Sequence, residues 1–169
     1  MAEGFEERFR ANYADILRLA RARLARERSP ISTVTLAHEL YLNLQGKEDL
    51  RFATPGEFMA YASRAMRSLL VDMARERMAQ KRYAELMPLT LGADVPDLAG
   101  TPEQLVALDE ALTRLGTVDE RLMRVAEMRV IMGMEVAEVA LALAVSEPTV
   151  KRDWQRAKAF LHEALGVPP

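Results

Sequence analysis

The spacing of apolar residues predicts a chain built from helices. Over residues 5–24 apolar side chains recur at steps of three and four, which is the period of one face of a single long helix. A second helix is expected to begin at the hydroxyl cluster Ser32/Thr33/Thr35, where a side-chain oxygen can cap it, and to end near Gly46. The face that this helix should bury consists of Leu36, Leu40, Tyr41 and Leu44.

The middle of the chain predicts a loop, a long helix and a linker. Residues 46–57 are polar and contain Pro55-Gly56, which indicates a loop. A third helix is expected over residues 57–83, with an inward face made of Phe58, Tyr61, Ala65, Leu69 and Met73. Residues 86–102 contain three prolines and no basic residue, so we expect a flexible linker there.

Helical periodicity returns after the linker, in residues 103–169. We expect a first helix with a stripe of leucines at 105, 108, 112 and 115 that is broken at Gly116, and a second helix that Gly133 ends. Residues 135–161 have the pattern of a helix-turn-helix, with the small residue Ala140 where the helices cross and a tight turn at Ala144-Val145-Ser146. Alanine at position 144 is unusual, because the turn requires a left-handed backbone that glycine adopts more readily.

Composition supports an all-α fold and excludes several functions. Ala, Leu, Arg, Glu and Met dominate the 169 residues, and these are good helix formers. With no cysteine, the chain has no disulfide, thiolate metal site or cysteine nucleophile. The two histidines are far apart and there is no phosphate-binding glycine loop, so we expect neither catalysis nor a metal or other cofactor. No apolar run approaches the roughly 20 residues that a membrane span needs, and we expect a cytoplasmic protein.

Charge is unevenly distributed between the two halves. Residues 1–85 hold 15 Lys/Arg against 12 Asp/Glu, and residues 103–169 hold 8 against 11. Cations concentrate on two predicted helices, over residues 64–82 and 147–162. Such helices can neutralise phosphates, and an aromatic residue such as Tyr61 can stack on an unpaired base. A solvated charged face explains either helix alone, but two basic helices joined by an acidic linker favour a bipartite DNA-binding protein.

The order of these motifs resembles a bacterial RNA polymerase sigma factor of the sigma-70 family, extracytoplasmic-function (ECF) class. The resemblance rests on TLAHELYLNL, on FMAYASRAMRSLLVDMARERMAQKR and on the run Thr149 to Trp154 with the following Arg156-Ala157. It implies two small helical domains joined by the flexible linker. Residues 1–85 would be region 2, which binds the core polymerase β′ clamp helices and the −10 element. Residues 86–102 would be the linker, and residues 103–169 region 4, which binds the −35 element and the β flap.

The resemblance also implies roles for individual residues. Contact with the −35 element falls on the recognition helix, at Ser146, Glu147, Thr149, Lys151, Arg152, Gln155 and Arg156. Contact with the −10 element falls on Tyr61, Arg64, Arg67, Arg75 and Arg77. The motif that would bind the polymerase clamp supplies His38, Glu39, Tyr41 and Leu42. Partners would be core RNA polymerase and promoter DNA, together with an anti-sigma factor or a Ser/Thr kinase as regulator.

The clamp-binding stretch departs from the acidic cluster that many ECF factors place there. Residues 31–39 hold a single carboxylate and three hydroxyls, at Ser32, Thr33 and Thr35. A phosphate on one of them would add about −1.5 to −2 charge and restore contact with a basic clamp surface, which predicts a phosphorylation switch. The alternative is that these hydroxyls only cap the helix.

Two other functions remain open from sequence alone. A stand-alone helix-turn-helix regulator would use residues 103–169 for DNA and residues 1–85 for sensing or dimerisation. A helical adaptor or anti-factor would keep the fold without promoter binding.

Overall fold

A computed structural model describes residues 3–18, 33–45, 50–86 and 101–167. The described chain is helical apart from one short antiparallel pairing of β1 (Glu3–Gly4) with β2 (Arg51–Phe52). The labelled helices are α1 (Phe5–Ala11), α3 (Thr33–Leu44), α4 (Pro55–Leu86), α5 (Pro102–Val118), α6 (Glu120–Val130), α7 (Val136–Leu143) and α8 (Glu147–Leu165). The predicted all-α class is confirmed.

The N-terminal helix is interrupted, so the prediction of one helix over residues 5–24 is wrong. Helix α1 ends at Ala11, and helical structure resumes over residues 13–18. Asn12 leaves the helical conformation at φ −106° and ψ 10°, and its side-chain amide donates to the Arg8 carbonyl at 2.8 Å. An asparagine side chain competes with the helix for backbone groups, which explains a break that apolar spacing does not register. Residues 19–24 lie outside the described residues.

The start of α4 also differs from the prediction. The expected loop over residues 46–57 ends early, because Arg51–Phe52 pairs with the N-terminus and α4 begins at Pro55. Thr54 accepts from the Glu57 amide at 3.1 Å, and Glu57 accepts from the Ala53 amide at 2.7 Å. Thr54 therefore caps α4, and the Glu57 side chain bonds the backbone one residue before this cap. Proline is favourable in the first turn of a helix. The pair Pro55-Gly56 is therefore the start of α4 and not part of a loop. Gly46 lies outside the described residues.

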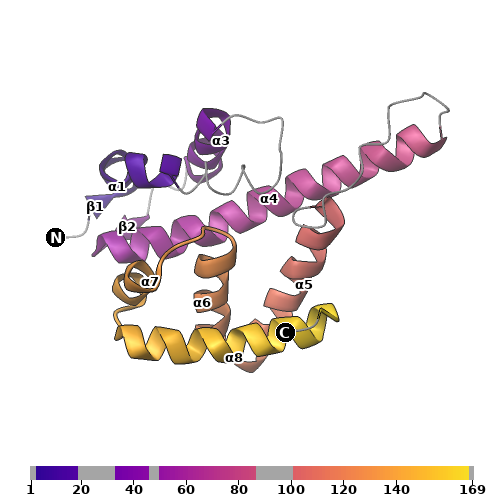
Figure 1. The fold of residues 1–169 in the computed structure, drawn as a ribbon. Helices are drawn as coiled ribbons and strands as arrows, with labels where there is room; N and C mark the ends of the chain where they lie inside the picture. Colours follow the sequence, from indigo (N-terminus) through magenta and orange to yellow (C-terminus); the bar gives the residue numbers. More distant parts are fainter. Residues whose placement is uncertain (1–2, 19–32, 46–49, 87–100, 168–169) are drawn as a thin grey trace.

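Helix α4 is the central element of the fold. Figure 1 shows α1, α3 and the strands on one side of it and α5, α6 and α7 on the other. Its most buried stripe is Phe58, Ala62, Met66, Leu70 and Ala74, which lies beside the predicted face. Tyr61, Ala65, Leu69 and Met73 are only partly buried. The prediction assumed that α4 is covered from one side, whereas neighbours cover it from two.

The C-terminal helices follow the predicted order with one correction. Helix α5 continues through Gly116 and ends at Val118, where Asp119 caps the next helix by accepting from the Leu122 amide at 3.2 Å. Gly116 is therefore a helical residue and not a break. Gly133 has φ 66°, the left-handed conformation that suits glycine, and follows the end of α6 as predicted.

The two halves of the described chain contact each other across α4. One cluster of buried apolar side chains runs from Phe5 to Leu161. A close backbone contact between them lies at Gly56, where an added Cβ would lie 2.8 Å from both the Ala142 Cα and the Leu141 carbonyl oxygen. Residues 87–100, most of the expected linker, lie outside the described residues, and the division into two domains stays a prediction. None of the described helices combines the length and apolar character that crossing a membrane requires.

Candidate nucleic-acid interface

Helices α7 and α8 form the predicted helix-turn-helix. Ala144 follows α7 with φ 53° and ψ 44°, the left-handed conformation anticipated for this turn. The Val145 amide donates to the Ala140 carbonyl at 3.0 Å and the Ala144 amide to the Leu141 carbonyl at 3.3 Å, which is a Schellman closure. Ser146 then caps α8 by accepting from the Thr149 amide at 3.3 Å. The turn therefore fixes the angle at which α8 leaves α7.

The inner face of α8 is held by apolar packing and one ion pair. Val150, Ala157 and Leu161 are buried. The Asp153 carboxylate is 1% exposed and accepts from the Arg121 guanidinium of α6 at 2.7 and 3.3 Å. This pair raises the pKa of Arg121, chiefly through the hydrogen bond and then through the charge of Asp153. A buried carboxylate needs such a partner, so the pair fixes the rotation of α8 about its axis.

The opposite face of α8 carries the residues predicted to contact DNA. Ser146, Glu147, Lys151, Arg152, Gln155 and Arg156 are exposed, and Thr149 is partly buried with its hydroxyl 2.9 Å from that of Ser146. Trp154 faces the core side, where Arg129 and Lys158 lie 5.5 and 5.8 Å from its ring centroid. A face of cations and an amide flanked by a fixed turn can contact phosphates and base edges in a major groove.

The residues predicted to contact the −10 element differ in how exposed they are in the structure. Arg64, Arg75 and Arg77 are exposed on α4. Tyr61 is partly buried, with its ring 5.6 Å from that of Phe52. Arg67 instead points into the C-terminal half, and its side chain is only 12% exposed. The structure therefore leaves three of these cations facing solvent and turns the fourth toward α5 and α6.

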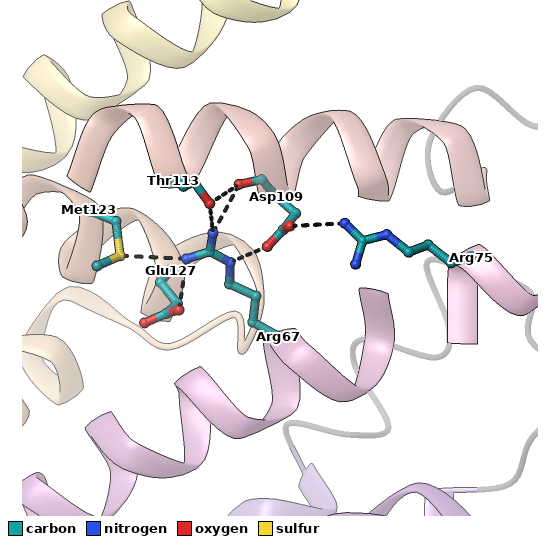
Figure 2. A network of polar contacts seen from close by, with 6 residues as sticks. All are labelled: Arg67, Arg75, Asp109, Thr113, Met123 and Glu127. Carbon is teal, nitrogen blue, oxygen red and sulfur yellow. Dashed lines mark hydrogen bonds and ion pairs between the residues drawn. The ribbon is translucent and has the colours of Figure 1, made fainter. Parts of the chain in front are cut away.

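Arg67 lies in a network of polar contacts that Figure 2 shows from close by. Its Nε donates to Asp109 Oδ1 at 2.7 Å, and its Nη2 donates to the Asp109 carbonyl at 2.9 Å and to Thr113 Oγ1 at 2.8 Å. Its Nη1 lies 3.2 Å from Glu127 Oε1 and 3.7 Å from Met123 Sδ. Each guanidinium nitrogen of Arg67 thus has an acceptor. The N–H donors of Arg67 are therefore not available to another ligand while this network is intact.

Glu127 is the buried acid of the network. Burial raises the pKa of its carboxyl, and the charges of Arg67, Arg64 and Arg124 together with the Arg67 hydrogen bond oppose this rise. Sequence reasoning missed Glu127 and Asp109 as partners of a candidate DNA contact. A signal for Glu127 was its position between the apolar residues Ala126 and Met128, because an acid that becomes buried beside such residues needs a cationic partner.

The predicted clamp-binding residues divide between two faces of α3. His38, Glu39 and Leu42 are exposed, and Val34 extends the same surface at 60% exposure. Tyr41 faces inward, with its ring 5.7 Å from that of Phe5 and 5.2 Å from that of Phe9. Its hydroxyl donates to Glu6 at 3.2 Å, and desolvation and the Glu6 charge raise its pKa.

The candidate phosphorylation residues cluster at the start of α3. Thr33 is the first residue of the helix and Thr35 is exposed in its first turn, whereas Ser32 lies outside the described residues. The first turn of α3 carries no acidic residue. The expected cap of this helix by a hydroxyl of the Ser32/Thr33/Thr35 cluster stays a prediction, because the residue before Thr33 lies outside the described residues.

Comparison with known proteins identifies a family. The family model described as ECF sigma factor matches residues 2–167, nearly the whole chain. No curated protein and no solved structure gives a significant match.

Proposed function

The chain belongs to the ECF sigma factor family, and from this premise we propose how its helices divide the recognition of a promoter. Sigma factors of this family direct core RNA polymerase to promoters, so core polymerase and promoter DNA are the partners. The family match favours this function over a stand-alone regulator or an adaptor. The assignments of single helices and residues are our proposal, and none of them requires a catalytic step by the chain itself.

Helix α8 inserts into the major groove of the −35 element. The observation that carries this assignment is the left-handed turn at Ala144 followed by the Ser146 cap, which presents Lys151, Arg152 and Arg156 on one exposed face. Arginine pairs with guanine edges and cations pair with phosphates, so this face supplies both base reading and positioning.

Helix α4 contacts the −10 element through its exposed cations. Arg64, Arg75 and Arg77 lie on one long helix, whose length suits an extended track of phosphates. Tyr61 stands near the start of the same helix as a candidate stacking residue.

Helix α3 docks on the β′ clamp helices of core polymerase. Val34, His38 and Leu42 recur at steps of four and are exposed, which gives one side of this helix two apolar side chains and an imidazole for a partner to contact. Glu39 adds the single carboxylate. The β flap contact that the family resemblance implies would fall on the C-terminal half.

A promoter-selection experiment tests these assignments. Core RNA polymerase is mixed with the chain and a library of promoter fragments, and initiation is expected at a shared two-part sequence. The Arg152→Ala variant should lose the upstream part of that sequence, and Arg77→Ala should lose the downstream part. Arg114→Ala removes an exposed cation from α5 and serves as the matched control. Initiation without any shared sequence, or equal losses in all three variants, would contradict the proposal.

Phosphorylation of the α3 terminus provides a switch for polymerase binding. A helix N-terminus favours negative charge, and the first turn of α3 has none of its own. Thr35→Glu should therefore bind core polymerase more tightly than Thr35→Ala, and Thr33→Glu should behave in the same way. Gln45→Glu adds the same charge just beyond the other end of α3 and is the control. Equal affinity of all the variants in a pull-down titration would exclude the switch.

A further inference from the structure

One exposed carboxylate stands among the cations that α8 presents to solvent. Between Ser146 and Arg156 the chain has two acids. Asp153 is buried and paired with Arg121 of α6, whereas Glu147, the first residue of α8, is exposed. A surface that binds DNA gains affinity from each cation that neutralises a phosphate, and an acid opposes this gain. Affinity for phosphates therefore does not explain Glu147.

The carboxylate of Glu147 has no partner among the residues that the structure describes. Lys151 follows one turn later, at the spacing where a glutamate and a lysine can pair, yet no ion pair or side-chain hydrogen bond joins the two. The helix cap is Ser146, which accepts from the Thr149 amide. An acid in the first turn also favours a helix electrostatically, which is the alternative role of Glu147. That role is independent of DNA sequence.

The place of Glu147 in the helix-turn-helix is one from which base edges are contacted. In this motif the N-terminal residues of the second helix contact the bases of the major groove. Here the left-handed turn at Ala144 and the cap at Ser146 directly precede Glu147. When α8 inserts into the groove, this carboxylate therefore lies at its inserted end. Lys151 lies on the same side of the helix, and its charge offsets part of the repulsion between the carboxylate and the phosphates.

The hydrogen-bonding groups of the major groove limit what a carboxylate can contact there. An ionised carboxylate only accepts hydrogen bonds. Guanine presents two acceptors to the groove, and thymine presents an acceptor and a methyl group, so neither base donates to a carboxylate. Adenine presents its N6 donor beside the N7 acceptor, which repels the second carboxylate oxygen. Cytosine presents only its N4 donor, so it is the base that suits Glu147.

We propose that Glu147 is a specificity-determining residue, whose carboxylate accepts a hydrogen bond from the N4 amino group of a cytosine in the −35 element. This inference rests on the proposed function of α8 as the helix that reads that element. On other sequences the carboxylate approaches the phosphates without gaining this bond, so it lowers the affinity for them. Glu147 therefore acts against wrong promoters as well as in favour of the right one.

Selection of −35 sequences with core RNA polymerase is the first measurement. Promoter fragments randomised across the −35 element are mixed with polymerase and the chain, and the fragments that initiate are sequenced. Wild type should enrich cytosine at one position at least about fivefold over other bases, the lower end of discrimination by a base contact. Glu147→Gln should enrich adenine there, because an amide pairs with adenine N6 and N7. Glu163→Gln removes the same charge from an exposed position near the other end of α8 and should retain cytosine.

The affinity for single promoters is the second measurement. Four fragments that differ only at the selected position are titrated with polymerase and each variant, and binding is followed by fluorescence anisotropy. Glu147→Ala should bind the four fragments equally, and it should bind the three without cytosine more tightly than wild type does, because a repulsive charge is gone. A purely structural Glu147 would give a different result, in which Glu147→Ala weakens binding to all four fragments by one factor. Circular dichroism verifies that each variant remains helical.

The outcomes distinguish this inference from the proposed function. If wild type initiates at a shared two-part sequence but Glu147→Gln selects the same −35 bases, Glu147 reads no base and the inference is wrong, while the proposed function stands. The randomised duplexes are also selected by binding to the full chain alone at low salt. A cytosine preference that Glu147→Gln changes to adenine in that selection supports the inference, even if no form of the chain directs initiation. If neither selection gives a preferred base at any position, the inference is wrong as well.

Discussion

Replacing Ala144 by glycine should stabilise the protein, although the same change in a helix normally destabilises it. Ala144 is exposed and holds φ 53° and ψ 44° in the turn between α7 and α8. A left-handed conformation costs a residue with a Cβ about 1–2 kcal/mol, and glycine does not have this cost. Glycine also has a more flexible unfolded state, which offsets about 0.4–1 kcal/mol of the gain. The net expectation is a rise of about 0.5–1 kcal/mol in the free energy of unfolding.

Thermal and urea unfolding measure this change directly. The unfolding entropy near the midpoint is about 2.1 cal/mol/K per residue, so a gain of about 0.5–1 kcal/mol raises Tm by roughly 1.5–3 °C for a chain of this length. Ala159→Gly is the matched control, because Ala159 is exposed in the interior of α8 with ordinary helical neighbours. It should lower the free energy of unfolding by about 1 kcal/mol.

The two substitutions are chemically identical and should have opposite signs. If Ala144→Gly lowers Tm as Ala159→Gly does, then the turn does not strain Ala144, and the argument from its backbone conformation is refuted. A rise in Tm with unchanged DNA binding would also show that the turn retains its geometry with either residue.

Three further predictions concern buried and capping groups. Arg121→Met should lower the free energy of unfolding in urea by about 3 kcal/mol, because it leaves the buried Asp153 carboxylate unpaired. Asp153→Asn should cost less, about 1–2 kcal/mol, since Arg121 can reach water. Burial raises the pKa of Glu127, so the native state binds more protons there than the unfolded state does. The free energy of unfolding measured in urea should therefore decrease more from about pH 5 to about pH 7 for wild type than for Glu127→Gln. An equal decrease in the two proteins would contradict a raised pKa of Glu127. Ser146→Ala should lower stability by about 1 kcal/mol and Ser146→Asp should retain it, because aspartate also accepts from the Thr149 amide. Equal losses in both variants would exclude a capping role.

The sequence around residues 135–161 was sufficient to predict the helix-turn-helix formed by α7 and α8. The helix-turn-helix depends on a turn, a cap and the spacing of Val150, Ala157 and Leu161, and all of these are properties of adjacent residues. The exposed face of α8 followed from the buried one, because a helix has a fixed period. Apolar spacing was less reliable for the ends of helices. The Asn12 side-chain hydrogen bond accompanies a break in the N-terminal helix, and strand pairing at Arg51–Phe52 shortens the expected loop before Pro55.

The sequence by itself determined the helical class, the order of most helices and the left-handed turn at Ala144, because these depend on the period of a helix and on the backbone preferences of single residues. Only the tertiary structure decided which side of α4 is buried and where its cations point. Arg64 and Arg67 look equivalent along the chain, yet one is exposed and the other meets Asp109 and Glu127, which are more than 40 residues away. An ion pair between distant residues depends on how helices pack in three dimensions, and neither charge nor periodicity along the chain records that packing.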